Sequence, residues 1–437
     1  MGRPGLFRSA FLCVALFTML AGEVLRYSVT WWGYGAVVAG LAAASVIILV
    51  QERARWSWRS LPPELLAFVA LITVSIAWSA YPAASAIGVF TTWLTVLGGT
   101  AIAVAFPWQH ILWGLGVVLR AVLAGSLVFE LWVSLVVRHP VLPLWVNYPE
   151  GPLPLMLFWS RNVLLEGGKI QGLVGNSSLL AFLALLGVIV FAVQWVDARA
   201  RDDARSRRMR RLAPLWVLLA VALIAMTRSP TIYVAAAAVA GVTVVLLLVR
   251  RASSRAGRVW VGVGSGLVGA AGVAALFAGG GRLLELVGKS PTLTGRSEIW
   301  ATVAALAEQR PFFGWGWVSY WAPWVWPFDS LVTRNGVVQL HAHNAWLDVW
   351  LQVGLVGVVI FAACVLAAVV RAFRVGVASG WGWPVSALPL AILVALVVQS
   401  AAESRLLVEY GLLLLVVVSV SSRAWLRERA AVRQAAR

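Results

Sequence analysis

Long apolar runs alternate with short charged clusters along the whole chain. The hydrocarbon core of a bilayer is about 30 Å thick and takes about 20 apolar residues per helix, and runs of that length recur from one end to the other. Because a lipid-exposed backbone must satisfy its own hydrogen bonds, each run predicts a helix. Twelve spans are expected, at Leu6–Val24, Trp31–Val50, Glu64–Ala80, Ala86–Phe106, Ile111–Val137, Leu179–Val196, Ala213–Thr227, Thr231–Val249, Val259–Phe277, Ala345–Val370, Pro384–Ala402 and Leu406–Ser422.

Composition agrees with this pattern. The chain has 437 residues, of which 61% are hydrophobic and 12% are charged. Soluble domains carry about 25% charged residues, so a soluble globular protein is excluded. Intrinsic disorder is excluded as well, because it needs low hydrophobicity and high net charge. The predicted fold is an all-α integral membrane protein in which residues 1–437 form a single polytopic domain.

The charge of +18 predicts an orientation. In a soluble protein it would suggest a nucleic-acid partner, but in a membrane protein basic residues mark the cytoplasmic segments, so no nucleic acid is expected. Most of the 35 basic residues fall on the side of the N-terminus, including the arginine-rich stretch 199–211 and a basic tail at 423–437. We therefore expect a multi-pass protein of the cytoplasmic (inner) membrane with both termini in the cytoplasm, its basic segments contacting membrane lipid.

Two connections on the opposite side are too long to be tight turns. They run over residues 138–178 and over residues 278–344, the second between the ninth and tenth predicted helices. Ordered loops longer than about 15 residues are usually functional. Chemistry is therefore expected on the extracytoplasmic side.

The second loop contains a predicted short amphipathic helix on the membrane surface. Ile299, Val303 and Leu306 recur at helical spacing, and Pro311 ends the pattern. Arg296 falls in the first turn, where a cation opposes the helix dipole. An anion bound at the helix N-terminus would explain this arginine, and so would a side chain reaching to lipid headgroups.

Tryptophans crowd the segment that follows. Five lie within a dozen residues, at Trp315, Trp317, Trp321, Trp324 and Trp326. Flat indoles suit the apolar faces of sugars or the entrance for a lipid tail, and they also suit a loop half sunk in the interface. On the first interpretation, Trp315 and Trp317 contact the substrate.

Two of the four histidines, His341 and His343, lie together at the outer mouth of the tenth helix, followed by Asn344. Histidine serves as a general base near neutral pH. Gly354 and Gly357 on the same helix permit close helix contact. Two histidines at this spacing also suggest zinc, but a third ligand is not evident in the sequence, and histidines merely hydrogen-bonded at the interface are a further alternative.

Two more cations fall on the same predicted side. Lys169 lies in the glycine-rich approach Gly167–Asn176, whose backbone amides suit a phosphate, and Arg228 lies in the tight turn Thr227–Pro230. Glycine-rich turns are common, so the first motif is weak alone. Together with Arg296 and a histidine, these cations suit a diphosphate and a hydroxyl nucleophile.

With these motifs the sequence resembles the O-antigen ligase and polymerase family of bacterial membrane glycosyltransferases. The resemblance covers most of the chain and is strongest over residues 169–357. It rests on His343-Asn344 followed by Gly354 and Gly357, on Gly295–Trp300, on Pro311–Gly316, on Lys169–Asn176 and on Trp78–Ser85. One departure is the turn at Arg228, because the family's usual arginine position holds Pro230.

The resemblance implies a GT-C-like arrangement of about twelve helices with a large extracytoplasmic loop. It implies transfer of a glycan from a polyprenyl-diphosphate donor to the hydroxyl of a glycan or glycolipid acceptor, with no metal ion or cofactor. His343 would be the base that deprotonates the acceptor and Arg296 would hold the donor diphosphate. Lys169, Arg228, His341 and Asn344 are expected to bind substrate, as are the two tryptophans named above.

Alternatives remain at this stage. The sequence does not separate a ligase from a polymerase. An exporter or flippase of lipid-linked glycans is the alternative from another class, although such transporters usually show internal repeats and polar residues near midplane. Arg120 is the one strong charge near the middle of a predicted span, where either a polar contact within the bundle or a place along the lipid-diphosphate path would explain it.

Overall fold

A computed structural model describes residues 5–146, 148, 150–267, 269, 296–334, 336–378 and 382–435. Eight of its helices are long and apolar enough to cross a membrane: α2 (Gly22–Gln51), α4 (Pro82–Ala105), α5 (Trp108–Trp132, extended to Val137), α6 (Ser177–Arg199), α7 (Ala204–Thr227), α8 (Pro230–Arg251), α11 (Ala345–Val377) and α13 (Glu409–Ala435). Three apolar helices are shorter: α1 (Leu6–Leu20), α3 (Pro63–Val74) and α12 (Leu388–Ser400).

Each predicted span except the ninth overlaps one of these helices, which confirms the all-α membrane fold. The ninth, Val259–Phe277, lies partly outside the described residues, and its described part continues the helical stretch 255–267. The number of twelve spans stays a prediction.

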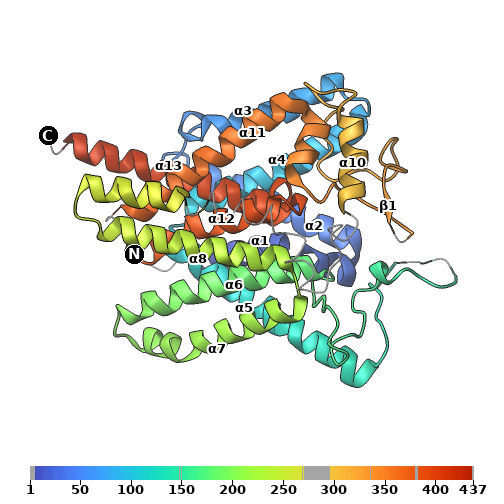
Figure 1. Cartoon of the computed structure of the whole chain (residues 1–437), viewed down its shortest axis with the longest axis horizontal. Coiled ribbons are helices and arrows are strands. Elements are labelled where there is room, and N and C mark those ends of the chain that lie inside the picture. Colours follow the sequence, from blue (N-terminus) through green and yellow to red (C-terminus); the bar gives the residue numbers. More distant parts are fainter. Residues whose placement is uncertain are drawn as a thin grey trace.

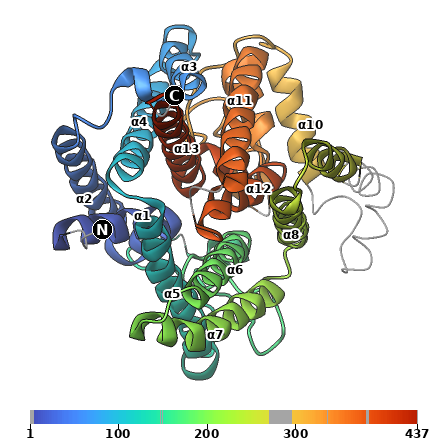
Figure 2. The same ribbon diagram turned by 90° about the vertical axis from the view of Figure 1, so that its left-hand side faces the viewer.

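The long helices form one bundle with two distinct ends (Figure 1). One end carries α10 (Arg296–Ala307) and the hairpin of β1 (Thr333–Arg334) and β2 (Val337–Val338), and we call it the loop end. The other, the tail end, carries the C-terminal part of α13. Viewed from the tail end, α13 lies between α4 and α11, and α7 packs beside α6 (Figure 2).

The helices begin where the sequence supplies caps or proline. Asn176 and Asp203 accept backbone N–H groups at the starts of α6 and α7. Proline occupies the first turn of α3, α4 and α8, where its missing N–H has no partner to lose. Local sequence therefore determines where these helices begin.

The predicted helix is confirmed as α10, and its position on the membrane surface stays a prediction. Its buried face consists of Ile299, Val303 and Leu306, which join a loop-end core that includes Trp321 and Phe328. Arg296 is the first residue of this helix, as the spacing predicts. The face is covered by the protein itself, because α10 packs on α11.

The loop after α10 crosses α11 where that helix is interrupted. Gly354 has φ +69° and ψ −173°, and the carbonyls of Pro311 and Phe312 accept the N–H groups of Leu355 (2.8 Å) and Val356 (3.2 Å). Gly314, with φ +67°, lies against the Gln352 backbone from the other direction. The segment Pro311–Gly316 and the segment around Gly354 are therefore the two stretches of backbone that cross here.

The side chain of Arg120 makes its contacts inside the helix bundle. Its guanidinium donates to the Gly116 carbonyl (2.9 Å) and to Oε1 of Gln194 (2.5 Å), and it lies over the rings of Phe191 and Trp216. These partners belong to α5, α6 and α7, so the structure supports the bundle-contact interpretation.

Candidate functional site

One buried carboxylate joins two residues that the sequence singles out. Glu403 lies in the turn after α12, with Oε1 2.7 Å from Nη2 of Arg296 and Oε2 3.1 Å from Nδ1 of His343. Its side chain is 10% exposed, against 18% for Arg296 and 21% for His343. Residues from the starts of α10 and α11 and from the end of α12 thus converge at the loop end.

Electrostatics keep Glu403 ionised. Burial opposes its negative charge, but attraction to His343, the hydrogen bond from His343 and attraction to Arg296 together outweigh burial and hold the pKa of this carboxyl well below its usual range. An ionised carboxylate only accepts hydrogen bonds, so Nδ1 of His343 carries a proton. The other ring nitrogen, Nε2, lies 3.3 Å from Oε1 of Gln339.

The backbone around His343 is firmly held. His343 has φ +52° and immediately precedes α11, where Oδ1 of Asn344 accepts the N–H groups of Trp346 (3.0 Å) and Leu347 (3.2 Å). This is an N-cap, so the contacts of Asn344 are with the helix and position its neighbour.

His341 supports the same turn. Its Nδ1 accepts the backbone N–H of His343 at 3.1 Å, and the two rings lie 4.1 Å apart. Burial, followed by the proximity of His343, lowers the pKa of His341 well below its usual value, so this ring is neutral with its proton on Nε2. His341 and His343 therefore differ in chemistry although they are two residues apart.

Both histidines line a cavity of about 700 Å³ that opens between the loop end and the bundle. Its polar wall includes Gln339 and Tyr320, and Trp324 lies at its edge with 70% exposure. The remainder is largely apolar and comes from α1, α2, α4 and α13, with Leu41, Ile87, Leu94, Leu412 and Leu413 among its lining residues.

A network of four charges borders the same cavity. Arg26 pairs with Glu23 (2.7 Å) and with Glu409 (2.9 Å), and Arg405 pairs with Glu409 and donates to the Tyr320 hydroxyl at 2.5 Å. The two cations and two anions balance, so the network ties α2 to α13 and to the loop without adding net charge to the cavity.

Trp315 and Trp317 are placed differently from the expectation of substrate contact. Trp317 is fully buried, with Nε1 donating to Thr92 (3.0 Å), and Trp315 is 6% exposed, with Nε1 donating to the Leu306 carbonyl (2.9 Å). Their indoles fill the core beneath the loop, because the crossing at Gly354 brings this segment down onto the helices. Neither ring face is presented to a ligand in this structure.

In the glycine-rich segment before α6, the backbone amides that were expected to bind a phosphate bind a carboxylate of the protein instead. The N–H groups of Gln171 (2.9 Å) and Gly172 (2.7 Å) donate to Oε1 of Glu130, a buried carboxylate of α5. Lys169 is exposed beside this turn. The amides that suit an anion are thus already bound to an anion of the protein.

Arg228 lies near that turn. It is exposed, ends α7 with φ +47°, and its Nη2 is 3.5 Å from where a Cβ on Gly167 would lie. Neither Arg228 nor Lys169 is among the residues that line the cavity beside His343. The structure thus brings Arg296, His341 and His343 together through Glu403, and of these residues only the two histidines are among those that line the cavity.

The residues also satisfy part of a metal site. Nitrogens of His341 and His343 and an oxygen of Glu403 lie within 4.8 Å of one another, so the third ligand that is not evident in the sequence is present in the fold. Two imidazoles and a carboxylate suit zinc. In this arrangement, however, the Nδ1 atoms of both histidines and both Glu403 oxygens already make hydrogen bonds within the protein.

Glu403 is the main residue that sequence reasoning missed, and Arg405 is the second. Both could have been found from the sequence, because Glu403 and Arg405 lie in a short turn between two apolar runs. Acidic residues are few in this chain, 17 in all, so one at such a place is conspicuous. Ionisable residues beside membrane spans are costly and usually have a partner.

Comparison with known proteins agrees with the motifs. The model of the O-antigen ligase family matches residues 213–362, which contain Arg228, Arg296 and His343. The exopolysaccharide production protein ExoQ of Rhizobium meliloti (strain 1021) is 33% identical over 99 residues, and the match covers 21% of this chain and about a fifth (22%) of that protein. Residues 213–362 are thus similar to the O-antigen ligase family, and the long apolar helices agree with a multi-pass membrane protein.

Proposed function

We propose that this protein is a metal-independent glycosyltransferase that moves a glycan from a polyprenyl-diphosphate donor to the hydroxyl of a glycan or glycolipid acceptor, as a ligase or polymerase of cell-surface polysaccharide. The observation that carries the proposal is the bridge from Glu403 to His343 and Arg296 beside a cavity. It joins a base to a cation in the way this reaction requires.

His343 is the base in this scheme. Glu403 holds the proton on Nδ1, and in the neutral ring Nε2 takes the proton of an acceptor hydroxyl that replaces Oε1 of Gln339 as its neighbour. The acceptor oxygen then bonds to the anomeric carbon of the donor, and the bond from that carbon to the diphosphate oxygen breaks. The imidazolium that forms is stabilised by the Glu403 carboxylate and by Oε1 of Gln339, and it returns its proton to water.

Arg296 neutralises the leaving group. Negative charge develops on the diphosphate as the bond breaks, and a cation already in place stabilises it without reorganisation. The ion pair with Glu403 uses Nη2 of Arg296, whereas a guanidinium has five N–H donors, so the diphosphate has further donors to bind.

The cavity suits an amphipathic donor. Polar groups surround His343, while the walls from α2, α4 and α13 are apolar and match a polyprenyl chain. The excess of arginine at the tail end supports an extracytoplasmic position for the site in the cytoplasmic membrane. Lys169 and Arg228 are proposed to meet the glycan or diphosphate outside the cavity, where both are exposed.

The test is transfer by the purified full chain in proteoliposomes that contain polyprenyl-diphosphate glycan and candidate acceptors. We expect His343→Ala and Arg296→Ala each to abolish transfer, because one removes the base and the other the cation. His139→Ala and Arg138→Ala are matched controls from the other long loop, exposed and away from the cavity, and should transfer normally.

Full activity of either site variant would overturn the assignment. Movement of the lipid-linked glycan across the bilayer with no new glycosidic bond would favour the exporter instead. A chelator should leave transfer unchanged, and loss of transfer that zinc restores would show that His341, His343 and Glu403 hold a metal.

A further inference from the structure

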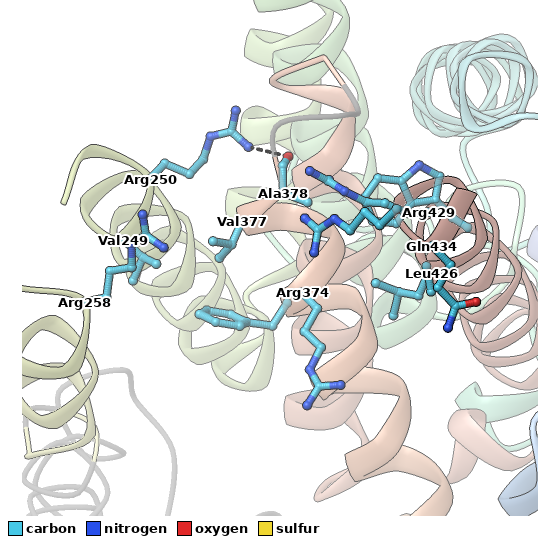
Figure 3. A pocket seen from close by; sticks show the side chains of 13 residues that line it. Val249, Arg250, Arg258, Arg374, Val377, Ala378, Leu426, Arg429 and Gln434 are labelled. Atoms are coloured by element: carbon cyan, nitrogen blue, oxygen red, sulfur yellow. Dashed lines mark hydrogen bonds between the residues drawn. The ribbon is translucent and has the colours of Figure 1, made fainter. Parts of the chain in front are cut away.

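A second cavity lies at the tail end, far along the bundle from His343. It measures about 770 Å³ and lies among α8, α11, α13 and the helical residues 255–267. Figure 3 shows its lining side chains, with the Arg250 guanidinium bonded to the Ala378 carbonyl. Five arginines and no acidic residue are among those that line it: Arg250, Arg258, Arg374, Arg429 and Arg433.

Four of these arginines, Arg250, Arg258, Arg374 and Arg433, contrast with arginines elsewhere in the chain that pair with a carboxylate. Arg8 pairs with Glu52 (2.7 Å), Arg201 pairs with Asp197 (3.1 Å), and Arg371 pairs with Glu64. Within the described part of the chain, in contrast, the ion pairs to carboxylates do not include Arg250, Arg258, Arg374 or Arg433. The pocket therefore gathers four arginines that are in no ion pair with a described carboxylate.

Helix ends account for only part of this charge. Arg250 donates to the carbonyls of Gly376 (2.8 Å) and Ala378 (3.2 Å) at the C-terminus of α11, where a cation is favourable. Arg374 and Arg433 are exposed and make no comparable bond to a helix end among the described residues. Like charges that line one pocket repel one another, so a bound anion would relieve the repulsion.

Apart from Gln434, the other side chains that line the pocket are apolar. Phe373, Val377, Trp425 and Leu426 contribute to it, and Arg250 stacks on Trp383 with its guanidinium carbon 5.3 Å from the ring centroid. A guanidinium matches the geometry of a phosphate through paired N–H donors. Apolar side chains beside these arginines suit a phosphate that carries a hydrocarbon part.

We propose that this arginine pocket binds a phosphate-bearing anion. The phosphate belongs either to the headgroup of an anionic phospholipid of the adjacent leaflet or to a soluble phosphate compound. Each arginine near an anionic membrane surface contributes about 1 kcal/mol, so losing two should weaken binding about 30-fold. The proposal concerns the opposite end from the proposed glycosyl-transfer site and does not depend on it.

The test uses the purified full chain in detergent, with native mass spectrometry to count bound phosphatidylglycerol or phosphatidylcholine. The variant Arg374→Gln/Arg433→Gln should bind phosphatidylglycerol about 30-fold more weakly than wild type. The control Arg251→Gln/Arg255→Gln removes two exposed arginines at the same end that do not line the pocket, and it should bind as wild type does. Arg374→Lys/Arg433→Lys keeps the charge and should fall between the two.

Inorganic diphosphate added as a competitor distinguishes the two sources. Displacement of phosphatidylglycerol from wild type, absent in the Gln variant, identifies a pocket open to soluble phosphates, whereas retention of the lipid identifies a headgroup site. Equal losses in the pocket and control variants, or equal binding of phosphatidylglycerol and phosphatidylcholine to wild type, would overturn the proposal.

Discussion

The substitution Gly354→Ala tests whether the backbone crossing positions the proposed site. A Cβ at this position would lie 2.1 Å from the carbonyl carbon and oxygen of Phe312, which is far inside van der Waals contact. The obstruction is backbone, so no rotamer change relieves it, and the loop would have to move by about 1 Å. The backbone angles themselves, φ +69° and ψ −173°, are also essentially restricted to glycine.

The two effects give the expected magnitude. Strained backbone angles of this kind cost about 1–3 kcal/mol, and forced overpacking costs about 1–3 kcal/mol more. We expect thermal unfolding in detergent to show a loss of about 2–6 kcal/mol. Because a misplacement of about 1 Å can lower a rate about 100-fold, glycan transfer should fall by about that factor even below the unfolding temperature.

Gly241→Ala is the matched control. This glycine lies within α8, nothing is within 4 Å of its added Cβ, and alanine is favoured over glycine inside a helix. The control should unfold at or above the wild-type temperature and transfer normally. Wild-type stability and transfer in Gly354→Ala would refute the reasoning, because the crossing would then not constrain the loop.

Further predictions concern the site and the loop that covers it. Asn344→Ala removes the N-cap of α11, so it should lose about 1 kcal/mol of stability and slow transfer by releasing His343. Because the pKa of Glu403 is lowered in the folded protein, its negative charge stabilises the fold fully above its unfolded pKa. The difference in unfolding temperature between wild type and Glu403→Gln should therefore be full above about pH 5 and shrink as the pH falls. A difference that grows on acidification would contradict this. Trp317→Ala should lower the free energy of unfolding by about 3–5 kcal/mol, because it leaves a cavity where a buried indole was. Trp324→Ala, at the exposed edge of the cavity, should change the free energy of unfolding by less than about 0.5 kcal/mol and raise the KM for the donor.

The fold was largely predictable because its main elements are encoded locally. Apolar runs of bilayer length gave the long helices, and the spacing of Ile299, Val303 and Leu306 gave α10. That Arg296 and His343 lie close together could be predicted only from the resemblance to a family. Nothing in their spacing alone places the start of α10 beside the start of α11.

What escaped prediction depends on contacts between distant segments. Glu403 is 60 residues from His343, and no periodicity links the turn after α12 to that histidine. The amides near Lys169 were read as an anion cradle, and the anion is Glu130 from the preceding helix. The burial of Trp317 could not be read from composition, because an indole in a loop serves a core and a ligand surface equally well.

The bridge by Glu403 has a consequence for how relatives can be recombined. The family match ends at residue 362, so the carboxylate that holds both proposed reactive side chains lies beyond it. A chimera that exchanges only residues 213–362 would transplant a base and a cation into a host that must supply its own counter-charge. The smallest segment that carries all three side chains into a chimera therefore extends through the turn after α12.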